Sequence, residues 1–397
     1  MKVLVNCDRF PWPLDNGQNL RIWHYVRALR DRHEFDLVCW GEEPVPAEVS
    51  ALFGSVLCFP RPWFSAEASW WTRLRERIDY RCIIPASAAT REAIAQATAG
   101  GRYDLVWMSG WDTVTSLPQP LACAWLADIV DDGLIDLERE MAHETRLLRK
   151  LRLAKRWAQI FQVERHYFGA ADACAVVSEV DAASLARACR HTPIAALPNG
   201  VDAEFFRPSG EPEEPDTLVF EGRMDFAPNV DAVTWFVGEV LPRVRQVRPS
   251  VRFLAVGNKP APEVLALAGP TVEVTGWVDD VRPYLARAAL FVAPLRMGAG
   301  IKNKILQAWA MGKCVLTTPE AIGGLLAEPG RNLELADGAQ AMADRILELL
   351  ADPRRRAAVG AAGRATIDAH YTWARRAEAL EAVMWQAVAA HREKRHA

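Results

Sequence analysis

The chain has 397 residues, of which 50% are hydrophobic and 24% charged, and its formal net charge is -3. At roughly 100 to 200 residues per domain this length predicts two domains or one large one, and the composition excludes an intrinsically disordered protein. With 47 Lys and Arg residues against 50 Asp and Glu residues, the overall charge gives no support for a nucleic-acid partner.

The cysteines and the apolar segments bear on the compartment. The eight cysteines are scattered, without a C-x-x-C pair or a neighbouring histidine pair, so we expect reduced thiols and no metal site. The N-terminal apolar run is too short for a signal-peptide core, and no stretch approaches the ~18 to 20 apolar residues of a membrane span. The expectation is a cytoplasmic protein that meets a membrane, if at all, as a peripheral protein at its inner face.

The first half of the chain alternates short apolar runs with helix-length segments. A helical pattern covers residues 18–32, and strands are predicted at residues 2–7, 35–40, 55–59, 105–108, 124–129 and 173–177. Such alternation predicts an α/β fold in which helices cover both faces of a parallel sheet.

A second alternation follows a linker rich in proline and acidic residues, at residues 208–216. Its strands are predicted at residues 218–221, 251–256, 272–274, 290–293 and 314–317. We therefore expect two doubly wound domains, residues 1–206 together with a C-terminal helix at 372–397, and residues 207–371. Their ligand site should be a central cleft that the carboxyl ends of both sheets face.

Residues 293–312 are the most informative segment. A strand ends near Pro294, glycines permit close approach of the backbone, and Lys302 and Lys304 lie at the start of a helix. Lysines there oppose the helix dipole, and an anion on the exposed amides would relieve the conflict. The segment predicts a phosphate site; the alternative is a tight turn with solvated lysines.

From Gly298 to Val315 the chain resembles the donor-binding segment of family 4 (group 1) nucleotide-sugar glycosyltransferases, which have the GT-B fold. Further pieces agree with that family in order and spacing, at residues 13–17, 176–179, 198–202, 222–229 and 276–280. The resemblance implies two Rossmann-like domains, a helix after Tyr371 that crosses back to the first domain, and a UDP- or GDP-linked sugar as co-substrate with no further cofactor.

The resemblance also implies which residues bind the donor. Arg223 and Lys304 would neutralise its diphosphate, and Gly17 and Gly300 would let backbone amides approach it. Preorganised cations and amides would then stabilise the departing diphosphate in place of a metal. The other donor-binding candidates are Gly298, Lys302, Gln307 for the ribose, and Val278 along the base. For Arg223 the alternative is a salt bridge at the domain edge.

The chain departs from the family pattern at two places. Paired glutamates eight residues apart are frequent in the family, and these positions here hold Ala299 and Gln307. A lysine often follows the arginine by five residues, and here that position is Pro228. Gln307 can still hydrogen-bond a hydroxyl, whereas Ala299 cannot. We expect Lys302 or Lys304 to supply the missing charge, and only the resemblance implies that the sugar's configuration is retained.

Carboxylates at strand ends of the first domain are the candidates for acid or base chemistry. Asp128, Asp131 and Asp132 follow one apolar strand and Asp112 follows another, so both groups should point into the cleft. Asp131 and Asp112 are the catalytic candidates. Capping of the next helix or of a loop is the alternative role. Some family members place a histidine near Asp112, and none occurs here.

Two stretches of the first domain suggest an acceptor or membrane surface. Residues 146–156 contain six basic residues and no acidic one, interleaved with leucines, and residues 63–77 mix aromatic residues with arginines. Basic amphipathic segments suit anionic lipid headgroups or a phosphorylated acceptor. The alternative is a solvated arginine face over a buried leucine stripe. The candidate residues are Trp70, Trp71, Arg149 and Arg152.

The sequence thus predicts a metal-independent glycosyltransferase of the hexosyltransferase type, acting on a carbohydrate or lipid-linked acceptor in bacterial surface polysaccharide or glycolipid assembly. A nucleotide-sugar 2-epimerase of the same fold is one alternative. A non-catalytic protein that binds nucleotide sugars or scaffolds an assembly complex is another. The sugar, the base and the acceptor stay open.

Overall fold

Two compact units make up the chain in a computed structural model that describes residues 1–14, 16–64, 70, 78–130, 132–297 and 301–396. Unit 1 comprises Met1–Asn199 and Arg376–Ala397, and unit 2 comprises Gly200–Arg375. Each unit is built on its own parallel sheet, so the predicted α/β class with two Rossmann-like domains is confirmed.

Unit 1 contains, among the described residues, a seven-stranded parallel sheet of order β3-β2-β1-β4-β5-β6-β7. Its strands are β1 (Lys2–Cys7), β2 (Glu34–Trp40), β3 (Val56–Phe59), β4 (Leu105–Ser109), β5 (Ala124–Asp128), β6 (Ala173–Val176) and β7 (Ile194–Ala196). The central strands are buried along nearly their whole length, as expected for a parallel sheet covered on both faces.

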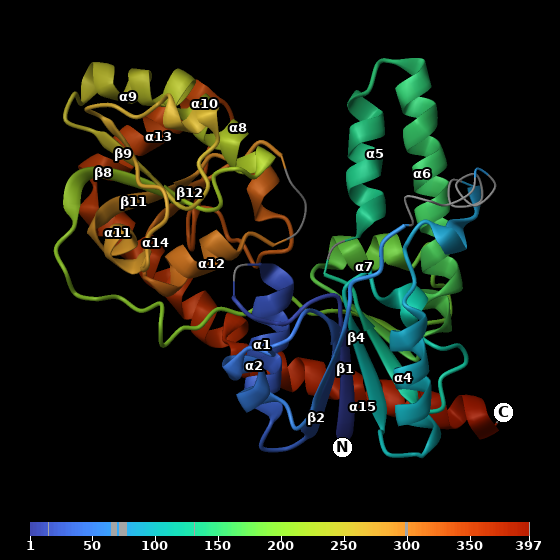
Figure 1. Cartoon of the computed structure of the whole chain (residues 1–397). Coiled ribbons are helices and arrows are strands. Elements are labelled where there is room, and N and C mark those ends of the chain that lie inside the picture. Colours follow the sequence, from blue (N-terminus) through green and yellow to red (C-terminus); the bar gives the residue numbers. More distant parts are fainter. Residues whose placement is uncertain (15, 65–69, 71–77, 131, 298–300, 397) are drawn as a thin grey trace. The chain divides into compact units, whose positions relative to one another are not determined.

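The helices of unit 1 follow its strands. They are α1 (Gly17–Leu29), α2 (Ala47–Leu52), α4 (Ala88–Ala99), α5 (Gly133–His143), α6 (Leu147–His166) and α7 (Glu179–Leu185), with 3₁₀ turns at Tyr80–Cys82, Val114–Ser116 and Phe168–Ala170. Helices α5 and α6 pack against each other as an antiparallel hairpin that extends well beyond the end of the sheet (Figure 1).

Unit 2 contains, in its described part, a six-stranded parallel sheet of order β10-β9-β8-β11-β12-β13. Its strands are β8 (Glu214–Glu221), β9 (Arg252–Val256), β10 (Val272–Val274), β11 (Ala288–Ala293), β12 (Val315–Thr317) and β13 (Glu334–Leu335). The core between this sheet and its helices includes the fully buried side chains of Phe220, Phe236, Phe253, Phe291 and Trp309.

The helices of unit 2 cover both faces of this sheet. They are α8 (Ala227–Trp235), α9 (Leu241–Val247), α10 (Pro262–Leu265), α11 (Arg282–Arg287), α12 (Asn303–Ala310), α13 (Ala339–Ala351) and α14 (Pro353–Thr366). A π-helical turn, Phe236–Val240, joins α8 to α9, a second one spans Ile367–Tyr371, and Pro319–Ile322 forms a 3₁₀ turn.

The last helix, α15 (Trp373–His396), starts in unit 2 and continues in unit 1. The carboxylate oxygens of its Glu381 lie 2.5 Å from a guanidinium nitrogen of Arg32 and 2.7 Å from Nε2 of His33. Near its end, His391 and Lys394 each lie 3.0 Å from a carboxylate oxygen of Asp172. These contacts fasten the helix to the unit 1 sheet, so the predicted return of the chain to the first domain is present.

A buried ion pair holds helix α1 to the sheet of unit 1. The Nε of Arg21 donates to both carboxylate oxygens of Asp128, at 2.9 and 2.8 Å, and neither side chain is exposed. Arg21 also donates to the carbonyl of Leu197 at 2.6 Å, while Trp107 donates to Asp128 at 3.2 Å. The pair thus connects α1 with β4, β5 and the segment after β7.

Removing one member of this pair should leave an uncompensated buried charge. We expect Asp128→Ala to lower the free energy of unfolding by about 3–5 kcal/mol, measured from urea denaturation followed by tryptophan fluorescence. The double variant Arg21→Met with Asp128→Leu removes both charges and should lose less than Asp128→Ala alone. A loss of under about 1 kcal/mol for Asp128→Ala would contradict this role.

Candidate functional site

The strand order reverses beside β1 and β4 in unit 1, and beside β8 and β11 in unit 2. Parallel sheets bind ligands in the crevice outside the carboxyl ends of their strands at such switch points. The loops after these four strands are therefore the places to look for functional side chains. In each unit, several of the side chains predicted from the sequence lie there.

In unit 2 the central residue is Lys304, in the first turn of α12. Its Nζ lies 3.9 Å from the centre of the Phe220 ring of β8 and donates a hydrogen bond to Oδ1 of Asn229 at 2.7 Å. The amide group of Asn229 in turn donates to the carbonyl of Arg223 at 2.8 Å. Lys304 is thereby tied to the loop between β8 and α8, which carries the other predicted diphosphate ligand.

Two glycines allow close packing of the backbone around this lysine. A Cβ atom on Gly222, whose φ is +152°, would lie 2.6 Å from Nζ of Lys304. A Cβ atom on Gly257, at φ +149°, would lie 1.8 Å from the carbonyl oxygen of Gly222. The backbone after β8 therefore lies close to the ammonium, and the backbone after β9 packs closely against Gly222, so neither position has space for a side chain.

The electrostatics of this site are poised for an anion. Burial lowers the pKa of Lys304 to about 7, with the charge of Glu221 opposing this shift and that of Lys302 adding to it. Burial also raises the pKa of Glu221, against the attraction of Lys304. Near neutral pH Lys304 is thus only partly protonated, and a bound phosphate would favour its charged form.

The other predicted donor residues of unit 2 surround Lys304 or follow neighbouring strands. Lys302 is the N-cap of α12, where no described side chain caps the helix, and Gln307 lies three residues beyond Lys304 on the same helix face. Arg223 is exposed and pairs with Asp225 at 2.7 Å, which is the alternative that the sequence left open for it. Val278, after β10, packs against the unit 2 core. Gly298 and Gly300 lie outside the described residues.

In unit 1 the corresponding strand ends carry carboxylates. Asp8 follows β1 and Asp112 follows β4, and both line a cavity of ≈190 Å³. The amide of Gln18 donates to Asp8 at 3.1 Å and to the carbonyl of Ser109 at 3.0 Å, which fixes the start of α1 against β4. Gly17, the remaining donor candidate, is the first residue of α1 and lies beside Gln18.

Arg61 joins the two carboxylates of this cavity. It lies 2.6 Å from Asp112 and 3.8 Å from Asp8. Burial and the charge of Asp8 raise the pKa of Asp112, while Arg61 and Arg9 counteract the shift. A carboxylate whose pKa is raised in a cavity at a switch point suits hydrogen bonding to, or proton transfer from, a substrate hydroxyl.

The aspartates after β5 behave differently from the prediction. Asp128 does not reach a ligand, because it is fully buried against Arg21, and its predicted orientation into a cleft is wrong. Asp132 is buried as the N-cap of α5, where it accepts the N–H of Leu134 at 2.8 Å, which is the alternative role. Asp131 lies outside the described residues. Of the two predicted catalytic residues, Asp112 is therefore the one that the structure describes.

The basic helix α6 presents apolar side chains to solvent. Leu147, Leu148 and Leu151 are 71%, 73% and 57% exposed, so a buried leucine stripe is wrong for these three residues. Arg149 pairs with Glu140 at 2.8 Å and Glu144 at 2.9 Å across the α5–α6 hairpin. Arg152 is exposed on the same helix, and Trp70 is exposed elsewhere in unit 1. Trp71 lies outside the described residues.

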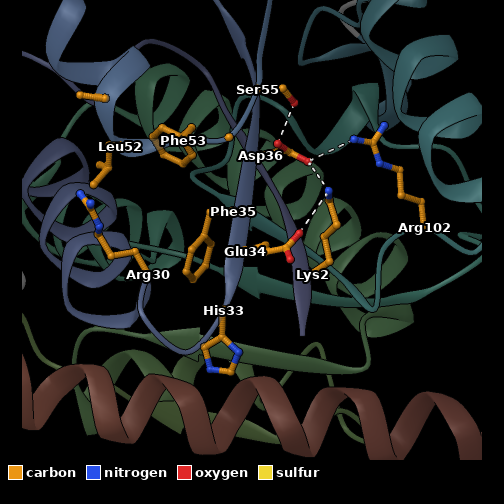
Figure 2. A pocket seen from close by; sticks show the side chains of 12 residues that line it. Lys2, Arg30, His33, Glu34, Phe35, Asp36, Leu52, Phe53, Ser55 and Arg102 are labelled. Atoms are coloured by element: carbon orange, nitrogen blue, oxygen red, sulfur yellow. Dashed lines mark hydrogen bonds and ion pairs between the residues drawn. The ribbon is translucent and has the colours of Figure 1, made fainter.

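A larger cavity of ≈470 Å³ opens at the opposite, amino-terminal edge of the unit 1 sheet (Figure 2). Several of its polar groups pair with one another, since Lys2 lies 3.4 Å from both Glu34 and Asp36, and Ser55 donates to Asp36 at 2.7 Å. Although burial raises the pKa of Asp36, hydrogen bonds from Ser55 and Tyr103 and the charge of Lys2 hold it below its ordinary value. This cavity lies away from the switch point.

Four residues of these sites were not singled out from the sequence: Asp8, Gln18, Arg61 and Asn229. Asp8 directly follows the first predicted strand, so the rule that selected Asp112 would have found it. Asn229 lies in a motif that the sequence matched to the family. Arg61 carries no local signal, because its role depends on contacts with Asp8 and Asp112, 53 and 51 residues away in the chain.

The described part of the chain shows neither a metal-binding cluster nor a membrane-spanning helix. No group of three or more His, Cys, Asp or Glu side chains among them is arranged to hold a metal ion. No helix in the described part combines the length and the apolar composition needed to cross a bilayer.

Comparison with known proteins agrees with this geometry. The family described as glycosyl transferases group 1 matches residues 215–352. A Corynebacterium glutamicum protein named GDP-mannose-dependent monoacylated alpha-(1-6)-phosphatidylinositol monomannoside mannosyltransferase is 28% identical over 205 residues, which cover 46% of this chain and 54% of that protein. The chain thus spans about half the length of the curated relatives it matches.

Solved structures resemble nearly the whole chain. Sucrose-phosphate synthase from Thermosynechococcus elongatus has a TM-score of 0.72 and 18% identity, covering 98% of this chain and 100% of that one. HepE from Anabaena, solved with UDP and glucose, has a TM-score of 0.64 and 15% identity, covering 95% and 98%. The chain therefore has the GT-B fold, and its residues 215–352 match the family of group 1 glycosyl transferases.

Proposed function

We propose that this protein transfers a sugar from a nucleotide-sugar donor bound by unit 2 to a lipid-linked or carbohydrate acceptor bound by unit 1. The single observation that carries the proposal is Lys304, half-buried at the strand-order switch of unit 2 and tied through Asn229 to the loop of Arg223. A partly buried ammonium beside glycines and a helix N-terminus suits a diphosphate. The names of similar proteins, which mention GDP-mannose or UDP, support a donor of this class.

The chain's own cations account for departure of the leaving group. As the sugar–phosphate bond breaks, negative charge grows on the diphosphate, and Lys304, Arg223 and the amides at the start of α12 stabilise it. For this, Arg223 exchanges its exposed partner Asp225 for phosphate oxygens. Gln307, on the same helix face as Lys304, hydrogen-bonds a ribose hydroxyl, and Val278 lies against the base. We propose that these groups act without a divalent metal and that the sugar keeps its configuration, as the resemblance implies.

On unit 1, Asp112 orients the attacking hydroxyl of the acceptor. Its carboxylate lines a cavity and has a raised pKa, so a small change of environment moves it between accepting and holding a proton. Asp8 and Arg61 position Asp112 through their charges. The neighbouring Gln18 keeps Asp8 in place.

Contact with an anionic membrane surface would bring a lipid-linked acceptor to this cavity. The exposed leucines of α6 alternate with basic residues, and such a segment lies at the interface between headgroups and acyl chains. We propose that the protein works as a peripheral protein at the inner face of the membrane, in assembly of a bacterial surface polysaccharide or glycolipid.

Binding of the donor phosphates should depend on Lys304 and on pH. Titration calorimetry with UDP and GDP should show that Lys304→Ala weakens the preferred nucleotide by about tenfold to a hundredfold. Because the pKa of free Lys304 is about 7 and a bound phosphate raises it, binding takes up a proton. Affinity should therefore fall by up to about tenfold per pH unit between about pH 7.5 and about pH 9.

Lys302→Ala is the comparison variant: it removes a lysine of the same segment but keeps Lys304, so a pH dependence should persist and move to higher pH, because the charge of Lys302 no longer lowers the pKa of Lys304. Purified protein supplied with the matching nucleotide sugar should also release free sugar slowly or transfer it. Saturable binding without any turnover would instead favour a non-catalytic binding protein, and absence of nucleotide binding would overturn the proposal.

Asp112→Asn should separate chemistry from donor binding. An amide keeps the shape of the side chain but cannot take a proton, so we expect the transfer rate to fall by about a hundredfold or more with nucleotide affinity unchanged. Asp31→Asn, at an exposed carboxylate beyond the end of α1, is the control and should keep full activity. An Asp112→Asn enzyme that transfers sugar at the normal rate would show that another group does this work.

The exposed leucines of α6 should govern binding to membranes. In flotation with anionic vesicles at low salt, Leu147→Asp should weaken binding by about tenfold, since it removes an inserted apolar group and adds a repelled charge. Val247→Asp, in unit 2, is a matched control because Val247 and Leu147 are both 71% exposed. Raising the salt should weaken binding of the unmodified protein. Equal flotation of both variants would contradict this surface.

A further inference from the structure

A second cavity lies at the foot of the α5–α6 hairpin and shares Asp112 with the acceptor cavity of unit 1. Its volume is ≈330 Å³. Ile83, Ile84 and Ile160 supply much of its wall, together with Trp111. At roughly 30 Å³ per water-sized group, this space holds about ten non-hydrogen atoms. It therefore accommodates a segment of a larger molecule beside the carboxylate that we assign to the acceptor.

The cavity combines these apolar walls with one cation, Arg156 of α6. Arg156 is exposed, and no hydrogen bond or ion pair joins it to any other residue that the structure describes. Arg149, two turns earlier on the same helix, is by contrast neutralised by Glu140 and Glu144. The guanidinium of Arg156 is thus available to an anion at the rim of an apolar cavity, and its planar donors match a phosphate.

The helix that supplies Arg156 also leads to the exposed leucines. Leu147 lies nine residues before Arg156, which corresponds to about 14 Å along an α-helix. An apolar chain that reaches from a lipid surface along α6 therefore passes Arg156 close to the cavity. Asp112, the group that we assign to the acceptor hydroxyl, also lines this cavity.

We propose that this cavity binds the lipid-phosphate portion of the acceptor, a molecule in which one phosphate joins an apolar chain to the group that receives the sugar. Ile83, Ile84 and Ile160 contact the first carbons of the chain, and Arg156 binds the phosphate. The inference rests on the proposed function, because it assigns Asp112 to the acceptor hydroxyl. It adds the chemical class of that acceptor.

The test uses geranyl monophosphate as a small probe, titrated into the full-length protein below the concentration at which the probe forms micelles. Binding is followed by calorimetry and by the fluorescence of the tryptophans, one of which lines the cavity. The protein should bind this probe at least about tenfold more tightly than geraniol or inorganic phosphate, because only the probe occupies both parts of the site.

Three variants locate the binding. Arg156→Gln should weaken geranyl monophosphate by about tenfold and leave geraniol unchanged, whereas Ile160→Ser should weaken both. Arg165→Gln removes the same charge from α6 outside the cavity and should bind like the unmodified protein. Equal binding of geranyl monophosphate by Arg156→Gln and the unmodified protein would overturn the proposal.

Nucleotide binding, measured on the same protein, separates this inference from the proposed function. Nucleotide binding and donor turnover without binding of geranyl monophosphate would overturn the lipid-phosphate site and leave the glycosyltransferase proposal standing. Binding of the probe that depends on Arg156, without binding of any nucleotide, would support the site and overturn the proposed function.

Discussion

The ammonium of Lys304 is the constraint on which the donor side of unit 2 depends. Placing a cation between the Phe220 ring and the backbone after β8 removes much of its water, and the resulting pKa of about 7 reflects that penalty. The surrounding residues accommodate the ammonium, since Gly222 has no side chain beside it and Oδ1 of Asn229 accepts a hydrogen bond from it. A bound diphosphate would favour the protonated form of Lys304, so part of the cost of burying this ammonium would be offset when an anion binds.

Unit 1 uses the same topology for the opposite chemistry. Its switch point bears Asp8 and Asp112, and burial raises the pKa of Asp112 where in unit 2 it lowers that of Lys304. A carboxylate suits a hydroxyl acceptor, and an ammonium suits a phosphate leaving group. The fully buried pair of Arg21 and Asp128 keeps the unit 1 strand ends together without exposing either charge. One sheet architecture thus provides two sites whose charges match the two substrates of the proposed reaction.

The sequence predicted the strands well because each is a short apolar run buried on both faces. It singled out Lys304 because the glycines and lysines of that segment are local to one turn. It omitted the edge strands β7 and β13, whose three and two residues carry too little pattern. It also omitted α14, where glycines suggest a break. In the structure Gly360 and Gly363 are instead close-packing positions, since a Cβ atom there would lie 2.0 Å from the Gly312 carbonyl or 2.5 Å from Trp309. Such contacts join distant parts of the chain.

The helical hairpin shows why a periodic pattern alone could not decide between a buried and an exposed leucine stripe. Both interpretations require the same spacing, and the outcome depends on what the partner helix offers. Helix α5 and its C-cap provide Glu140 and Glu144, which pair with Arg149, while Leu147 and Leu148 stay exposed. The hairpin is therefore held together at its end by charges while its leucines face outward. Clustered apolar groups in water are tolerated mainly where another surface covers them in use. Under the proposed function that surface is a membrane, and the basic residues beside the leucines favour anionic headgroups.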